Sequence, residues 1–127
     1  MSAAAPRQRR TIQEQRVNAL GMDPSIRDRL DLLILLGLAC YADRSGVVVP
    51  NLDDLARWGE CSTWEVSERI GKLEAQGRLR RPPRRRGLQL VISEEAFAVA
   101  RAWDRRYDAA TRAAEEYDAR VRARRAP

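Results

Sequence analysis

The chain has 127 residues and a formal net charge of +6 at pH 7. This length fits one small domain with an appendage, and a hydrophobic content of 44% is sufficient for one core. The sequence contains no His, so it lacks the commonest general base and the commonest metal ligand. An enzyme would have to use carboxylates, Cys or Arg alone. Because the sequence also has no Gly-rich phosphate loop, no paired thiols and no nucleophile with its base, we expect a protein that is not an enzyme and that holds no cofactor or metal. The excess of basic charge favours a polyanionic partner.

The basic charge is concentrated in short segments. Residues 1–10 carry +3, residues 23–77 carry −4, and residues 78–86 carry +6 from six Arg. All of the 24 basic residues except Lys72 are Arg, whose planar guanidinium suits phosphates and guanine edges. A GC-rich coding sequence would produce the same bias, so the position of the cluster is more informative than the composition.

The sequence favours a cytoplasmic protein that is not inserted in a membrane. The N-terminus lacks the apolar segment of a signal peptide, and the longest apolar run, residues 30–42, is too short to span a bilayer. This run predicts a buried core helix. Cys40 and Cys61 are isolated in apolar surroundings, and we expect both to be buried free thiols.

The N-terminal half predicts helices with one very short strand. Residues 1–10 are expected to form a disordered basic arm, and residues 11–21 can form a short helix. Asp23 can cap a helix that has Pro24 at its first position and runs to about Tyr41. The β-branched residues 47–49, between Gly and Pro, then predict a short strand.

Two capped helices joined by a tight turn follow. Asn51 caps a helix that Gly59 ends, and Ser62 opens the capping-box pattern S-x-x-E for a helix over about 63–76. This second helix places three apolar residues on one inward face: Val66, Ile70 and Leu73. Gly77 terminates it.

A β-hairpin with a basic tip is expected next. Residues 78–81 predict an edge strand, the segment from Pro82 to Gly87 predicts a turn, and residues 88–92 predict a second strand with alternate Leu and Ile residues on one face. The turn itself is almost purely Arg.

Taken together, residues 23–92 resemble the winged helix-turn-helix family of DNA-binding domains. The segments that carry the resemblance are Leu52-Asp53-Asp54-Leu55-Ala56, Ser62-Thr63-Trp64-Glu65-Val66 and Lys72-Leu73-Glu74-Ala75-Gln76-Gly77-Arg78-Leu79. The upstream Val48-Val49-Pro50-Asn51 is similar to the MarR-like and plasmid or phage replication-type members. The resemblance implies a mainly α fold with a small β-hairpin wing, and double-stranded DNA as the partner.

The expected DNA contacts come from the helix over 63–76 and from the wing. The helix carries Glu65 and Glu68 beside only two cations, so we expect the wing and the N-terminal arm to supply most phosphate contacts. The candidate DNA-binding residues are Ser62, Thr63, Trp64, Ser67, Glu68, Lys72, Arg80, Arg81, Arg84, Arg85 and Arg86. The alternative is a solvated Arg loop that binds RNA non-specifically or an acidic protein.

Three residues of the helix pair need separate interpretation. Trp58 is expected to pack in the core. Trp64 lies outward, where it contacts either DNA or the turn. Gly71, which costs about 1 kcal/mol in a helix relative to Ala, would allow close approach of DNA or of another helix.

The C-terminal segment predicts one long helix. Ser93 caps a stretch with no Gly or Pro up to Arg125, about 48 Å long if helical. Its apolar residues follow a heptad spacing: Ala96, Ala100, Trp103, Tyr107, Ala110, Ala114, Tyr117 and Val121. We expect residues from Trp103 to Val121 to form a homodimer, parallel or antiparallel. Folding back on the helix over 23–41, or docking on another protein, are the alternatives.

The predicted organisation is a basic arm with a possible short helix (1–22), a winged domain (23–92) and a long helix (93–127). The function that this organisation favours is a dimeric bacterial transcriptional regulator. The alternatives are an accessory DNA-binding protein of plasmid or phage replication, partition or transfer, and a protein–protein adaptor on a winged scaffold. Trp103 and Tyr107 could line a pocket for a small-molecule effector, whose identity the sequence does not indicate.

Overall fold

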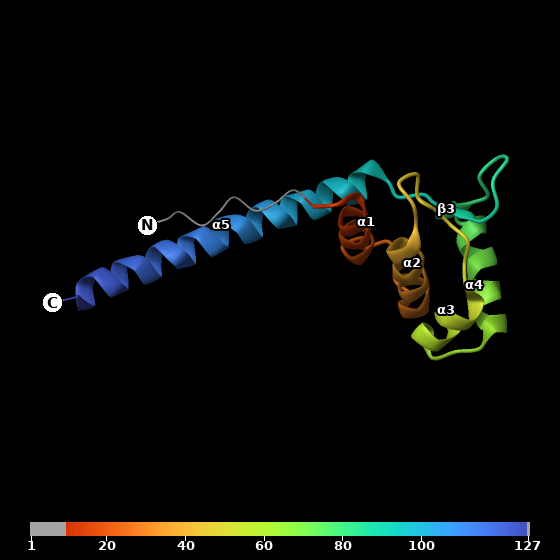
Figure 1. Ribbon diagram of the computed structural model, residues 1–127, viewed down its shortest axis with the longest axis horizontal. Helices are drawn as coiled ribbons and strands as arrows, with labels where there is room; N and C mark the ends of the chain where they lie inside the picture. Colours follow the sequence, from red (N-terminus) through yellow and green to blue (C-terminus); the bar gives the residue numbers. More distant parts are fainter. Residues whose placement is uncertain (1–9, 127) are drawn as a thin grey trace.

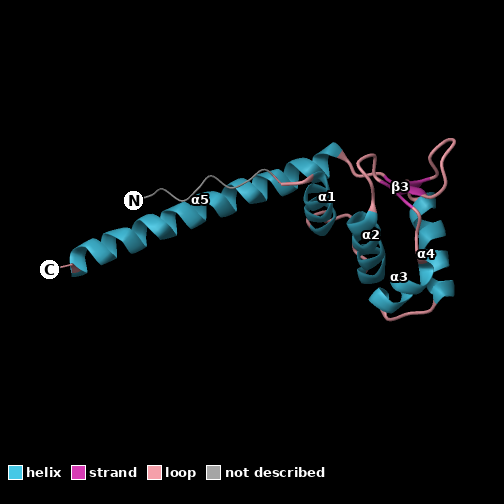
Figure 2. Ribbon diagram, viewed as in Figure 1, coloured by secondary structure: helices cyan, strands magenta, loops and turns pink. Residues whose placement is uncertain are grey.

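The computed structural model describes residues 10–126, which form five helices and a small antiparallel sheet. Four helices and the sheet gather at one end, and the fifth helix extends away from them as a single rod (Figure 1). Figure 2 shows the strands beside the C-terminal end of α4. The elements in chain order are α1 (Ile12–Gly21), α2 (Arg29–Tyr41), β1 (Val47–Val48), α3 (Leu52–Gly59), α4 (Thr63–Ala75), β2 (Leu79–Arg80), β3 (Leu88–Leu90) and α5 (Glu94–Arg125).

The mainly helical class and the short helix over 11–21 are confirmed, but the expected start of the core helix is wrong. Asp28, not Asp23, caps α2, and its side chain accepts a hydrogen bond from the backbone N–H of Asp31 at 3.0 Å. Asp23 instead accepts from the backbone N–H of Ser25 at 2.9 Å. Because this local turn occupies the Asp23 side chain, the helix begins one turn later than the sequence pattern suggests.

The core lies between α2, α4 and the sheet. Ile34, Leu35 and Leu38 of α2 are almost completely buried, as are Val66 and Leu73 of α4. The inward face predicted for α4 is therefore confirmed. These close-packed side chains hold α4 against the rest of the chain. Truncating any of them would leave a cavity and lower the free energy of unfolding.

The predicted hairpin is present, but it is part of a three-stranded sheet. The strand order is β1-β3-β2, and β3 pairs antiparallel with both neighbours. Both outer strands are shorter than expected, and Val49 is exposed rather than paired. Gly87 allows the close approach of the wing to β1, since a Cβ at this position, where φ is +106°, would lie 2.6 Å from the Val48 carbonyl oxygen.

The N-terminal turns of α5 pack on α1. Ala19 of α1 forms a buried cluster with Ala96 and Ala100 of α5, and these small side chains allow close helix approach. Arg10 adds a bidentate ion pair with Asp104, with N···O distances of 2.8 and 2.9 Å. The fold-back therefore involves α1 and not the helix over 23–41. The remainder of the predicted basic arm, residues 1–9, lies outside the described residues.

Three sequence expectations about burial need correction. Cys40 is exposed and Cys61 is only partly buried, although both are free thiols as expected. Trp58 is 58% exposed rather than a core residue. Its indole N–H donates to the Leu33 carbonyl at 3.1 Å, so the ring lies across the surface of α2 instead of inserting beneath it.

Candidate nucleic-acid interface

The turn between α3 and α4 is held by capping interactions at both ends. Glu60 adopts a left-handed conformation with φ of 52°, and the Cys61 N–H returns to the Ala56 carbonyl at 2.9 Å. Ser62 then caps α4 by accepting from the Glu65 N–H at 3.1 Å, and its hydroxyl donates to the Glu65 carboxylate at 3.5 Å. This turn sets the direction in which α4 leaves α3.

The two faces of α4 differ completely. One face is the buried row that packs in the core. The other is exposed and mostly polar, and it includes Trp64, which is 67% exposed. Gly71 lies on the exposed side, where an added Cβ would meet no atom within 4 Å. Five predicted residues share the exposed part of the helix and its cap: Ser62, Thr63, Trp64, Ser67 and Glu68.

The two cations of α4 contact α2. Arg69 lies 2.8 Å from the Asp28 carboxylate and 3.2 Å from that of Asp31, and Lys72 lies 3.5 Å from Asp31. The hydrogen bond with Asp28 raises the pKa of Arg69, and the same bond lowers the pKa of Asp28. Asp31 of α2 is only 5% exposed, and a buried carboxylate needs cationic partners. Because both partners come from α4, these ion pairs fix how α4 lies on α2. Lys72 thus contributes to positioning, although half of its side chain remains exposed.

Two Arg residues at the base of the wing have polar partners on neighbouring elements. Arg80 Nε donates to the Gln89 side-chain oxygen at 2.6 Å across the β2–β3 pair. Arg81 lies 3.2 Å from the Glu74 carboxylate, and 74% of its side chain is exposed. An exposed ion pair of this kind contributes little stability, so the Arg81 guanidinium can exchange Glu74 for a phosphate at small cost.

Arg85 joins the wing to the turn between α2 and β1. Its guanidinium lies 2.6 Å from the Asp43 carboxylate and donates to the Ser45 hydroxyl at 3.0 Å. Asp43 also accepts from the Ser45 hydroxyl at 2.6 Å and from the Val47 N–H at 3.1 Å. The hydrogen bonds from Ser45 and then from Arg85 lower the pKa of the Asp43 carboxyl well below its usual range.

The turn that holds Asp43 is supported from beneath by a residue that no sequence pattern indicated. Arg16 of α1 is 7% exposed, and its guanidinium donates to the carbonyls of Asp43 and Arg44 at 2.6 and 2.5 Å. A charged residue in a short amphipathic helix predicts a solvent-exposed position, and only the tertiary fold brings Arg16 to two backbone carbonyls. The position of the wing therefore depends on α1.

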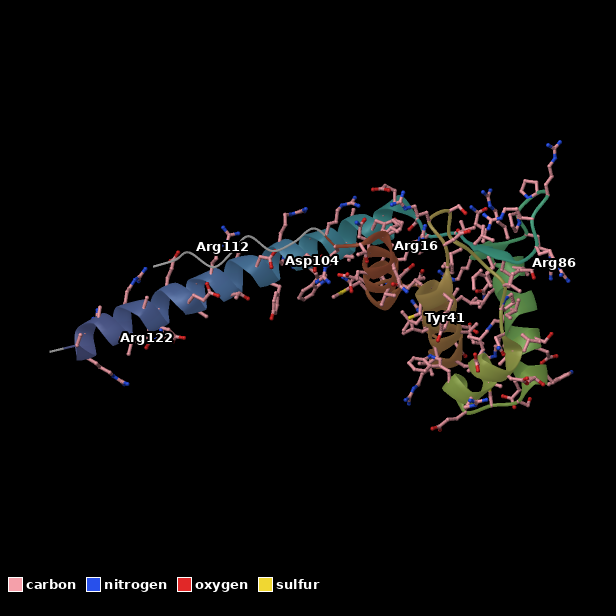
Figure 3. The ribbon with its side chains drawn as sticks, in the orientation of Figure 1. Arg16, Tyr41, Arg86, Asp104, Arg112 and Arg122 are labelled. Carbon is pink, nitrogen blue, oxygen red and sulfur yellow. The ribbon has the colours of Figure 1, made fainter. Side chains whose placement is uncertain are left out.

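Arg84 and Arg86 at the wing tip are the most available cations of the candidate interface. Both side chains are exposed, and neither has an ion pair with an acid within residues 10–126. Arg84 adopts a left-handed conformation with φ of 63°, which turns the loop at its tip. Figure 3 shows Arg86 on the wing, at the end of the molecule opposite to Arg122 of α5.

The seam of α5 is divided between a buried and an exposed part. Ala96 and Ala100 are buried against α1, whereas the exposed fractions of Trp103, Tyr107 and Tyr117 are 51%, 63% and 66%. Ala110 and Ala114 are also exposed, and Val121 is partly exposed. Figure 3 shows Arg112 midway along this part of the helix.

Among the hollows formed by residues 10–126, two are lined by exposed aromatic side chains. One, of about 280 Å³, lies where α1 meets α5 and is lined by Arg10, Asn18, Met22, Ala100, Trp103, Asp104 and Tyr107. Trp103 and Tyr107, which the sequence suggested could line a pocket, both line this hollow. The other, of about 400 Å³, is an apolar groove between α2, β1 and α3, with Tyr41 and Trp58 at its edges.

Within the part of the chain that the structure describes, no group of acidic or Cys residues is arranged to hold a metal ion. No helix among residues 10–126 is long and apolar enough to cross a membrane. Comparison of the chain with protein-family models, with curated proteins and with solved structures found no match.

Proposed function

We propose that this protein binds double-stranded DNA as a winged helix-turn-helix protein, with α3 and α4 as the helix pair and the β2–β3 hairpin as the wing. The observation that carries the proposal is the combination of two exposed surfaces. The solvent-facing side of α4 is polar, and the wing that follows it presents Arg84 and Arg86 to solvent. A polar helix face beside exposed guanidiniums suits a groove flanked by phosphates.

In this proposal α4 enters the major groove. Thr63 and Ser67 donate hydrogen bonds to bases or phosphates, and Glu68 accepts from a cytosine amino group. Trp64 makes apolar contact with sugar or a thymine methyl group. The wing residues Arg80, Arg81, Arg84, Arg85 and Arg86 bind phosphates.

The charge distribution assigns most of the affinity to the wing. The cations of α4 hold α2, so the face that meets bases carries an acid and neutral groups. Each phosphate that the wing neutralises contributes about −0.9 to the slope of log K against log salt. DNA binding by this protein is therefore expected to weaken steeply with salt.

The proposed biological role is that of a dimeric bacterial transcriptional regulator. The exposed seam of α5 supplies the contact between two copies, from Trp103 to Val121. Two winged domains related by a two-fold axis would bind a two-fold symmetric site. A role in plasmid or phage replication, partition or transfer uses the same DNA contacts, and the genes adjacent to this one distinguish it from regulation.

A paired set of charge variants tests the DNA proposal. We expect the double variant R84A/R86A to weaken binding to DNA from its own upstream region and to lower the salt slope by about 1.8. The matched control is R105A/R112A, which removes the same charge from exposed positions of α5. Equal losses in both variants, or no preference of the parent protein over random DNA at 150 mM salt, would contradict the proposal.

The adaptor alternative has one specific observation in its favour. The apolar groove between α2 and α3 exposes Tyr41 (80%) and Trp58 (58%) on the winged domain, away from the wing. An adaptor would keep its function when Arg84, Arg85 and Arg86 are all changed to Ala. Loss of both nucleic-acid binding and function in that triple variant would exclude it.

A further inference from the structure

The exposed seam of α5 has mirror symmetry along the chain. Trp103 and Val121 each lie nine residues from Arg112, Tyr107 and Tyr117 each lie five away, and Ala110 and Ala114 each lie two away. Small side chains thus occupy the centre, a Tyr flanks them on both sides, and larger apolar groups lie at the ends.

We propose that two copies of this chain pair through α5 in an antiparallel arrangement, with the two-fold axis at the level of Arg112. This inference rests on the homodimer of the proposed function and specifies its geometry. An antiparallel coiled coil places each a-type residue opposite a d-type residue of the partner. In this register Trp103 pairs with Val121, Tyr107 with Tyr117, and Ala110 with Ala114 of the second copy. The small side chains then meet at the centre, and the Tyr residues meet on both sides of it.

The charges at the C-terminal end of α5 favour this direction. Arg120, Arg122, Arg124 and Arg125 lie within the last two turns. A parallel pair would bring both clusters together, which costs free energy through like-charge repulsion. An antiparallel pair places the two clusters at opposite ends of the paired region.

Like charges approach each other on both flanks of the antiparallel seam, and one member of each pair has a counter-charge within its own chain. On one flank Asp104 would approach Asp118 of the second copy, and Arg10 binds Asp104 at 2.8 Å. On the other flank Arg106 would approach Arg120 of the second copy. The Glu116 carboxylate lies 3.8 Å from Arg120 within each chain and supplies the compensating charge.

The end of the paired region coincides with an existing hollow. The α1 helix covers the seam up to Ala100, and the hollow of about 280 Å³ opens next along the seam, bounded by Trp103. Val121 of the second copy would lie at the level of Trp103. The seam of each α5 would then be covered by α1 over its first turns and by the partner helix beyond them.

Cysteine cross-linking distinguishes the directions. In a C40S/C61S background, an equimolar mixture of A110C and A114C chains is expected to form disulfide dimers between the two variants. Each variant alone is expected to form few, because in the antiparallel pair identical positions are offset by four residues, about 6 Å along the axis. Efficient dimers of A114C alone would show parallel pairing and overturn the inference.

A sedimentation measurement on the parent protein accompanies the cross-linking. A monomer at all concentrations would overturn both the antiparallel pair and the dimeric part of the proposed function, whereas the DNA contacts are tested separately by the wing variants. Spin labels at the first residue of each α5, Glu94, should lie about 54 Å apart, since they would be separated by 36 helical residues. A much shorter separation would contradict the antiparallel register.

Discussion

The helices α4 and α5 are both amphipathic, but their own chain covers them to different extents. The apolar row of α4 is buried, so apart from Trp64 the exposed face of this helix is mostly polar. The apolar seam of α5 is buried only over its first turns and is exposed from Trp103 onward. A polar exposed face suits a wet, charged partner such as DNA, whereas an exposed aromatic seam suits another protein surface.

Leu73→Ala is expected to have the largest effect, because Leu73 lies on the buried face of α4. The Leu73 side chain is completely buried where α4 packs on the core, and its truncation should lower the free energy of unfolding by about 2–5 kcal/mol. Urea denaturation measures the loss. Ser67→Ala, on the exposed side of the same helix, is the control and should change stability by less than about 0.5 kcal/mol. Similar losses in both variants would contradict the burial of only one face.

Tyr117→Arg should affect the exposed seam without affecting the fold. Tyr117 is 66% exposed in the single chain, so the substitution removes no intramolecular core contact. In the proposed dimer it places a charge at an apolar contact, and self-association should weaken by at least tenfold, about 1.4 kcal/mol. Sedimentation equilibrium measures association and circular dichroism checks the helix content. Ala119→Arg, also exposed on α5 but outside the seam, is the matched control and should associate normally.

Local signals in the sequence were sufficient for much of this fold. The caps at Asn51, Ser62 and Ser93 are side chain–backbone hydrogen bonds between residues three apart, so the sequence contains both partners. The same signal misplaced the start of α2, because Asp23 and Asp28 are both acceptable caps. The contacts of both side chains decide between them. Asp23 is bound by Ser25 and lies 3.7 Å from Arg78, whereas the Asp28 carboxylate binds Arg69 of α4 at 2.8 Å.

Long-range contacts were the part that the sequence did not reveal. The pairing of β1 with β3, the burial of Arg16 beneath the Asp43 turn and the packing of Ala96 on α1 each join segments far apart in the chain. For the candidate interface, the pattern identified the exposed residues of α4 and the wing. It did not indicate that Lys72 contacts Asp31 or that Arg85 is bound by Asp43.

Asp43→Asn tests whether a cation released on the wing strengthens DNA binding more than a cation released on α5. Asn retains the oxygen that accepts from Ser45 and Val47 but releases Arg85 from its ion pair, so the wing gains one available cation. In the parent protein Arg85 must leave Asp43 before it binds a phosphate, so we expect tighter DNA binding by the variant, with a salt slope steeper by up to about 0.9. Glu94→Gln removes the ion pair of Arg101 at 2.7 Å on α5 and changes the net charge equally. A similar change of slope in this control would contradict the wing as the contact.

The same variant predicts a pH dependence. The folded-state pKa of Asp43 is lowered, so its contribution to stability is present above the unfolded value of about 3.9 and is lost as pH falls toward the folded value. When the pH is lowered below about 4, the stability of Asp43→Asn should therefore fall less than that of the parent protein, as measured by thermal unfolding. An unchanged acid dependence would show that the Asp43 contacts contribute nothing to folding.

Gly71→Ala has the smallest expected effect. It distinguishes the contribution of α4 to stability from its contribution to DNA binding. Gly71 lies on the exposed face, and an added methyl group meets no atom within 4 Å, so the helix should gain up to about 1 kcal/mol of stability. If this face enters the major groove closely, the same methyl group should weaken DNA binding while the protein becomes more stable. Ala substitution at Gly21, which also has open space around it, is the control and should leave DNA binding unchanged. Because the structural and functional effects of Gly71→Ala have opposite signs, unchanged or tighter DNA binding would place the DNA contact elsewhere than on this part of α4.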